Sequence, residues 1–141
     1  MVDNSTLAQI ASIIAAVGAA MLFFRIQREL EMGRQGEQIW IPYADRLLIF
    51  ATLLSIFLVI LPIVLIRESM VAVTNLTRAA CAAAVIMLGG YIPGILAHYR
   101  LVFGKNREGP RVNPEPGEKA VLWITLALAL LVFSVIISGI V

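Results

Sequence analysis

The chain has 141 residues, of which 60% are hydrophobic and 14% are charged, and its formal net charge at pH 7 is +2. A water-soluble domain of this length needs more charged surface to stay dispersed, so the composition excludes that class and predicts that lipid is the solvent. The slight positive charge does not indicate a nucleic-acid partner, because the basic residues lie beside apolar runs and are interleaved with acidic ones.

Four uncharged apolar runs make up more than half of the chain, and each is long enough as a helix to cross a hydrocarbon layer of about 30 Å. Backbone polar groups must be satisfied internally in lipid, and these unalternating runs do not suit barrel strands. We therefore predict an all-α integral membrane four-helix bundle that forms one domain over residues 1–141. Its expected spans are Leu7–Phe24, Leu47–Ile66, Ala79–Ala97 and Ala120–Val141.

The first run carries a face on which no side chain is larger than serine. Small residues let another backbone approach closely, which is how helices associate within a membrane. The members of this face, spaced at i,i+4, are Ala8, Ser12, Ala16 and Ala20. Beyond the run, the i,i+4 pair of Arg25 and Glu29 predicts that the helix continues for two more turns, until Gly33 and Gly36 end it.

The second and fourth runs are rich in Leu, Ile, Val and Phe, which make up 16 of 20 and 14 of 22 residues, whereas the third run has only six in 19. The second and fourth runs therefore suit lipid, and the alanines and glycines of the third suit a close neighbour. We expect the first and third helices to form the packed centre, with the other two outside them. The same small faces would equally suit a contact with another subunit, and the sequence does not separate these arrangements.

The third run contains the sequence Gly-Gly-Tyr-Ile-Pro-Gly over residues 89–94. Pro93 removes a backbone hydrogen bond, so we predict a kinked third helix that exposes carbonyl groups beside the Tyr91 hydroxyl to a ligand or water. The alternative is a kink that accommodates a neighbouring helix, with Gly90 and Gly94 as a close-packing pair. Pro62 is expected to bend the second helix.

His98, the single histidine, lies at the end of this run and is followed by Tyr99 and Arg100. Such a histidine could transfer protons or bind haem or a quinone, but a cation at a helix C-terminus is also an ordinary cap. No Cys, Asp or Glu lies near it at ligand spacing, so we predict neither a metal nor a cofactor.

Lys and Arg are unevenly distributed among the segments between the runs: nine lie in the first and third connections and two in the second. Under the positive-inside rule this distribution predicts two cytoplasmic loops, with both termini outside the cytoplasm (N-out/C-out). The expected location is the bacterial inner membrane. The pairs Asp45-Arg46 and Arg67-Glu68, at the two ends of the second run, are expected to be interface anchors.

No Asp, Glu, Lys, Arg or His lies in the central part of any run, which argues against a cation-coupled carrier, and no catalytic motif indicates an enzyme. We expect a non-catalytic accessory or assembly subunit that packs through its small-residue faces onto a larger membrane complex or onto copies of itself. The alternative is a small oligomeric channel or carrier for a neutral or lipid-like molecule, with candidate binding residues Tyr91, Pro93, His98, Tyr99 and Arg100. A third hypothesis is an enzyme or electron-transfer subunit that uses His98.

Overall fold

The computed structural model describes residues 3–36, 42–65, 71–101 and 114–139, with side chains described from residue 75 onward in the third of these segments. Within these ranges every regular element is helical, and four helices are long and apolar enough to span a membrane. The elements are α1 (Asn4–Arg34), α2 (Asp45–Leu54), the π-helical η1 (Ser55–Ile60), α3 (Leu61–Leu65), α4 (Val71–His98) and α5 (Pro116–Ile137). The four apolar runs fall in these helices as predicted, except that α5 ends at Ile137 and the fourth run continues into a turn at Ser138 and Gly139. Ile66 and residues 140–141 lie outside the described residues.

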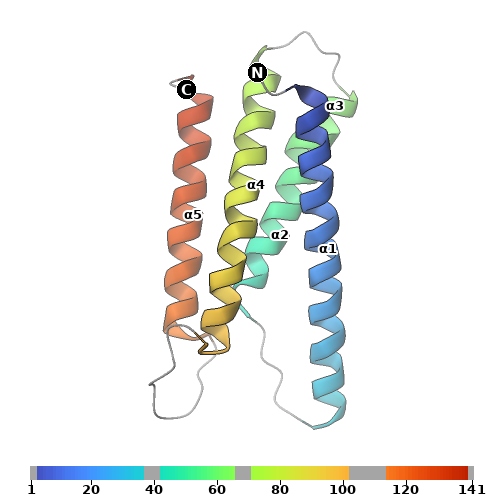
Figure 1. Cartoon of the computed structure of the whole chain (residues 1–141), viewed down its shortest axis with the longest axis vertical. Helices are drawn as coiled ribbons and strands as arrows, with labels where there is room; N and C mark the ends of the chain where they lie inside the picture. Colours follow the sequence, from blue (N-terminus) through green and yellow to red (C-terminus); the bar gives the residue numbers. More distant parts are fainter. Residues whose placement is uncertain (1–2, 37–41, 66–70, 102–113, 140–141) are drawn as a thin grey trace.

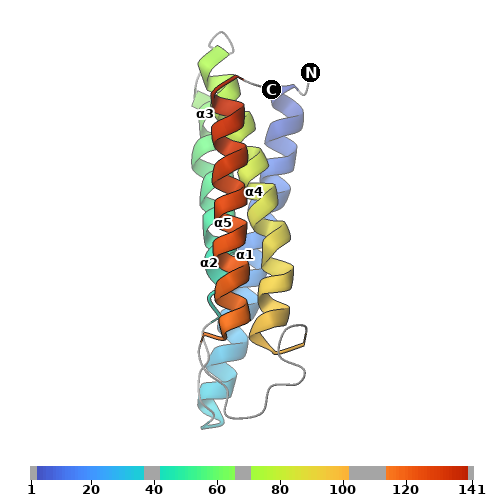
Figure 2. The ribbon, with the colours of Figure 1, turned by 90° about the vertical axis from the view of Figure 1, so that its left-hand side faces the viewer.

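The helices form an elongated bundle in which the start of α1 and the end of α5 lie at the same end (Figures 1 and 2). The end of α1, the starts of α2 and α5 and the end of α4 lie toward the other end, called here the lower end after its place in Figure 1. There α1 ends at Arg34, followed by the C-cap Gln35 and by Gly36 at φ +76°, which confirms the predicted extension beyond the apolar run. At the opposite end Asp3 caps α1 by accepting a hydrogen bond of 2.8 Å from the Thr6 backbone nitrogen, and hydrogen bonding to Thr6 lowers the pKa of the Asp3 carboxyl.

α4 is the central helix of the bundle and contacts α1, α2, η1 and α5. In the most apolar stretch of α4, 44% of the residues are buried, compared with 22%, 28% and 17% in the corresponding stretches of the first, second and fourth long helices. The expectation of two central helices is wrong for α1, which lies at the side of the bundle against α2, η1 and α4 (Figure 1). The small number of large side chains thus predicts the central position correctly for α4. The small residues of α1 do not place that helix at the centre.

α1 contacts the bundle through a face other than the predicted one. Its buried residues in the apolar run are Leu7, Ala11, Ile14 and Gly18. A Cβ atom at position 18 would overlap the Thr52 side chain of α2, so the absence of a side chain there brings the two helices together. Of the predicted face, Ser12, Ala16 and Ala20 are exposed on the outer side of α1 and Ala8 is half-buried.

Gly90 and Gly94 lie where α4 meets α5 and the start of α2. A Cβ atom at Gly90 would overlap the Thr125 side chain of α5, and one at Gly94 would lie 3.0 Å from the Ala44 Cβ. α4 continues through Pro93 without interruption, and Tyr91 is buried in a cluster with Ala44 and Leu48. These glycines therefore allow α4 to lie close to two other segments.

The second long helix changes its hydrogen-bond pattern just before Pro62. In η1 the Leu61 nitrogen donates to the Ile56 carbonyl, five residues back, instead of the four of an α-helix. Pro62 has no backbone N–H and its ring crowds the carbonyl four residues earlier, so the wider turn coincides with the position where the α-helical ladder is interrupted. The buried hydroxyls of Thr52 and Ser55, which belong to this helix, make no hydrogen bond to a described residue.

Candidate functional site

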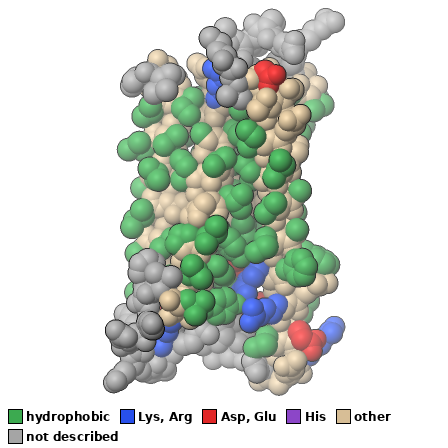
Figure 3. All heavy atoms as spheres, viewed as in Figure 1, with side chains coloured by type: hydrophobic (Ala, Val, Ile, Leu, Met, Phe, Trp, Pro, Cys, Tyr) green, Lys and Arg blue, Asp and Glu red, His purple; other side chains and the backbone are tan. Residues whose placement is uncertain are grey.

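Charged side chains that flank the apolar runs in the sequence come together at the lower end of the bundle. Figure 3 shows one face of the molecule, on which hydrophobic side chains cover the middle and charged side chains lie toward the two ends. At the lower end a set of mutually close polar residues, called here the ionic network, consists of Arg25, Glu29, Asp45, His98, Tyr99 and Glu118. The network draws on α1, the start of α2, the end of α4 and the start of α5.

His98 and Glu118 form the most deeply buried pair of the network, with 2% and 0% of their side-chain surfaces exposed. The His98 Nδ1 lies 3.0 Å from the Glu118 Oε2, and the Glu118 Oε1 accepts a hydrogen bond of 2.9 Å from the Ala44 backbone nitrogen. A single carboxylate thus joins α5 to α4 and to the residue that precedes α2.

Arg25 forms the second part of the network and is 9% exposed. Its Nη1 donates to the Tyr99 hydroxyl at 2.6 Å, its Nη2 donates to the Glu29 Oε1 at 3.1 Å, and its Nε lies 3.6 Å from the Asp45 Oδ2. The predicted i,i+4 pair of Arg25 and Glu29 is therefore confirmed. Arg25 also connects α1 with α2 and with the end of α4, contacts that sequence spacing did not indicate.

Asp45 and Arg46 are adjacent in the sequence but have different partners. Asp45 faces Arg25, whereas the Arg46 guanidinium lies 3.9 Å from the centroid of the Tyr43 ring, a cation–π contact. The expectation that Asp45-Arg46 anchors the helix at the membrane interface stays a prediction, and the structure adds an interhelical partner, Arg25, for Asp45. Arg67-Glu68 lies outside the described residues.

Arg100, which follows the end of α4, forms an ion pair with Glu115, which precedes α5. Its Nε donates to the Glu115 Oε1 at 2.8 Å, and its backbone has φ +56°, the left-handed conformation that ends many helices. The Leu101 nitrogen donates back to the Leu96 carbonyl at 2.9 Å, which completes this helix end. The ion pair therefore fixes the turn that leads out of α4 against the start of α5.

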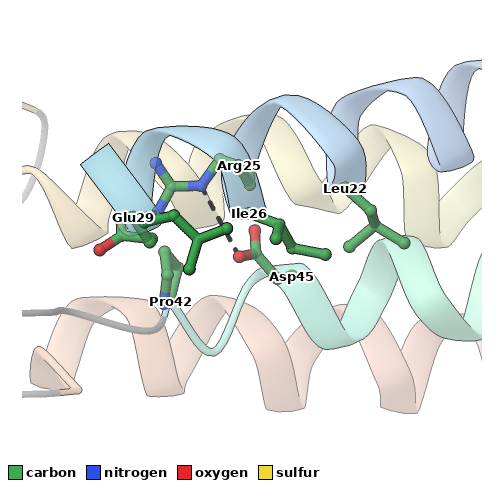
Figure 4. Close-up of a pocket in the computed structure, with 7 residues that line it drawn as sticks. Leu22, Arg25, Ile26, Glu29, Pro42 and Asp45 are labelled. Carbon is green, nitrogen blue, oxygen red and sulfur yellow. Dashed lines mark hydrogen bonds and ion pairs between the residues drawn. The ribbon is translucent and has the colours of Figure 1, made fainter. Parts of the chain in front are cut away.

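A hollow of about 240 Å³ adjoins the ionic network between α1 and the start of α2 (Figure 4). Its lining residues are Leu22, Arg25, Ile26, Glu29, Leu30, Pro42 and Asp45. Two buried atoms of these residues, the Arg25 Nε and the Asp45 Oδ1, make no hydrogen bond to a described residue. The hollow thus combines an apolar wall with one unused donor and one unused acceptor.

A second hollow, of about 360 Å³, lies higher in the bundle and is apolar. It is bounded by α2 and η1, α4 and α5, and its larger lining side chains are Leu54, Leu58, Met87, Leu126, Leu130 and Phe133. None of the described residues that line it is charged, so its chemistry suits a hydrocarbon chain or another apolar group.

Of the binding residues proposed from the sequence, His98, Tyr99 and Arg100 each contact a charged partner. Tyr91 and Pro93 lie earlier in α4. Sequence reasoning missed Glu118, the buried partner of His98. A signal for it existed, because the end of one span and the start of the next must meet when two consecutive helices pack as an antiparallel pair.

The described residues contain no group of three or more His, Cys, Asp or Glu side chains that could hold a metal ion. What the network can do chemically is to hold opposite charges in fixed positions and to present unused hydrogen-bonding atoms to a polar group. Comparisons of the chain with known protein families, with curated proteins and with solved structures found no match.

Proposed function

We propose that the chain is a multi-pass membrane protein whose role is non-catalytic assembly, through the outer face of α1, with a helix of another membrane protein or of a second copy. The observation that carries this proposal is the exposure of Ser12, Ala16 and Ala20 on a helix that already packs on the bundle through its opposite side. Helices associate in lipid where small residues permit close approach, and this face is left free by the chain's own packing.

The proposal places the four long helices across the bilayer, with the lower end in the cytoplasm. Large apolar side chains are exposed along these helices, among them Phe23, Phe57, Ile92 and Leu130, as lipid contact requires. Six basic residues of the described segments lie at the lower end, where positive charge favours the cytoplasmic side, namely Arg25, Arg28, Arg34, Arg46, Arg100 and Lys119.

Native gel electrophoresis after mild detergent extraction tests the assembly. Ala16→Leu places a large side chain on the outer face of α1 without touching the bundle, so we expect it to shift the chain from a larger species to the monomer. Ala127→Leu, at an exposed position of α5, is the matched control and should leave the larger species intact. A monomer in the unaltered protein, or an equal effect of both variants, would contradict the proposal.

A second candidate function, a small channel or carrier for a neutral or lipid-like molecule, is favoured by the apolar hollow between η1, α4 and α5. Leu126→Trp would fill this hollow, whereas Leu128→Trp adds the same ring to an exposed position of α5. The carrier hypothesis predicts that only the first variant slows transbilayer movement of a fluorescent phosphatidylcholine in reconstituted vesicles. Equal rates for vesicles with and without the protein would exclude this activity for that probe.

A further inference from the structure

The hollow beside Arg25 differs from the apolar one because charged as well as apolar side chains line it. Leu22, Ile26 and Leu30 of α1 supply apolar side chains, and Arg25, Glu29 and Asp45 supply charged ones. Figure 4 shows Arg25 between Glu29 and Asp45, with a dashed line to Asp45. Figure 4 also shows Pro42 near Glu29, in the segment that leads into α2. A ligand with a polar head and an apolar body matches this division.

The polar side of the hollow has one unused donor and one unused acceptor. The Arg25 Nε and the Asp45 Oδ2 are 3.6 Å apart, which is an ion-pair distance but too long for a hydrogen bond, and the Asp45 Oδ1 has no partner among the described residues. Buried donors and acceptors are nearly always paired in proteins, and an unpaired one indicates a partner outside the chain, such as a ligand or an ordered water. The two atoms therefore call for a group that accepts from Arg25 and donates to Asp45.

The charges of the hollow narrow the choice of that group. Among the described residues, the lining carries one formal positive charge, on Arg25, and two formal negative charges, on Glu29 and Asp45. A purely anionic ligand would meet two carboxylates, and a purely cationic ligand would leave the Arg25 Nε without an acceptor. A zwitterion with a phosphate oxygen and an ammonium N–H satisfies both atoms.

We propose that this hollow binds the headgroup of a phospholipid with a primary ammonium, of the phosphatidylethanolamine class. The phosphate accepts from the Arg25 Nε, the ammonium donates to the Asp45 Oδ1, and the lipid chains follow the apolar side formed by Leu22 and Ile26. Arg25 directly follows the first apolar run, the depth at which a headgroup begins in a bilayer. The inference rests on the membrane-spanning arrangement proposed above but not on assembly through α1.

Native mass spectrometry of the purified, delipidated chain in detergent tests this site with three synthetic lipids of equal chain length. Phosphatidylethanolamine should be retained about tenfold better than phosphatidylcholine, which has no ammonium N–H, or phosphatidylglycerol, which has no cation. Equal retention of the three lipids would overturn the proposal. Competition by free phosphoethanolamine at the concentration of the lipid would also overturn it, because a soluble molecule would then be the ligand.

Substitutions with matched controls locate the effect. Arg25→Gln and Asp45→Asn should each remove the preference for phosphatidylethanolamine, whereas Arg34→Gln and Asp3→Asn change the same residue types at exposed positions and should retain it. Ile26→Trp fills the hollow from a side chain that is 58% exposed and leaves the ionic network intact, so it separates lipid loss from misfolding. A lipid preference that survives all three hollow variants would contradict the site.

The outcome of this experiment is independent of the oligomeric state. Failure of assembly is seen as a monomer on native gels, and failure of membrane insertion is seen as release of the chain from membranes by alkaline carbonate. Loss of the lipid preference in a chain that resists carbonate and assembles would reject the headgroup site alone.

Discussion

The lower end and the middle of the bundle are held together by different kinds of contact. At the lower end, charged side chains from the four long helices are buried against one another, and Glu118 and His98 have almost no exposed surface. In the middle, large apolar side chains such as Leu47, Met87 and Leu122 pack together, and glycines allow close approaches, as where Gly90 meets Thr125 and Gly18 meets Thr52. Breaking a buried ionic pair costs more than overpacking a small-residue contact, so we infer that single residues at the lower end contribute more to stability than single residues in the middle.

This comparison predicts the largest loss of stability at Glu118. Glu118→Ala removes the carboxyl group that contacts the His98 Nδ1 and accepts from the Ala44 nitrogen, and breaking a buried pair in this way costs about 3–5 kcal/mol. Reversible unfolding in detergent, followed by circular dichroism, measures the change in the free energy of unfolding. Lys119→Ala, at the exposed neighbouring position, should change it by less than about 0.5 kcal/mol, and equal losses at both positions would reject the comparison.

A smaller loss is expected where the network depends on one hydrogen bond. Tyr99→Phe removes the hydroxyl that accepts from the Arg25 Nη1 at 2.6 Å, and a hydrogen bond to a charged group contributes about 1.5–3 kcal/mol. Tyr43→Phe keeps the ring over which Arg46 lies and should have a smaller effect in the same unfolding measurement. A larger loss in Tyr43→Phe than in Tyr99→Phe would show that Tyr99 does not hold Arg25.

Two neighbouring glycines sharpen the comparison for the middle of the bundle. Gly90→Ala places a methyl group on the Thr125 side chain and should destabilise the fold by about 1–3 kcal/mol through overpacking. Gly89→Ala has nothing within 4 Å of its new atom, so it should stabilise α4 by up to about 1 kcal/mol through helix propensity. Thermal unfolding of the two variants under one condition should therefore give shifts of opposite sign, and shifts of the same sign would contradict the packing.

The smallest effect on folding is expected at the outer face of α1. Ala16→Leu contacts no other part of the described chain, so the free energy of unfolding of the monomer should change by less than about 0.5 kcal/mol. Ala11→Leu, on the buried face one and a half turns away, should lower it by about 1–3 kcal/mol because it overpacks a fully buried position. Equal effects in denaturant titrations would mean that the outer face of α1 also packs within the bundle.

The helices could be predicted from the sequence because hydrocarbon requires long apolar runs with internally bonded backbones, and the small residues of the third run identified the central helix. The face by which α1 packs could not be predicted, because small residues suit an internal and an external contact equally. Both faces of α1 carry such residues: Ala11 and Gly18 lie on the buried face, and Ala16 and Ala20 lie on the exposed one. His98 and Glu118 each stood at a helix end, but their meeting depends on how α4 and α5 pair across 20 positions. The kink at Pro93 stays a prediction.

Site-specific photocrosslinking in native membranes tests assembly through α1 most directly. A benzophenone side chain at position 16 should give a discrete protein adduct, either a dimer of the chain or a complex with one partner. The same probe at position 130, where Leu130 is 67% exposed on α5, should react with lipid alone. No adduct at position 16, or the same adducts from both positions, would contradict the account.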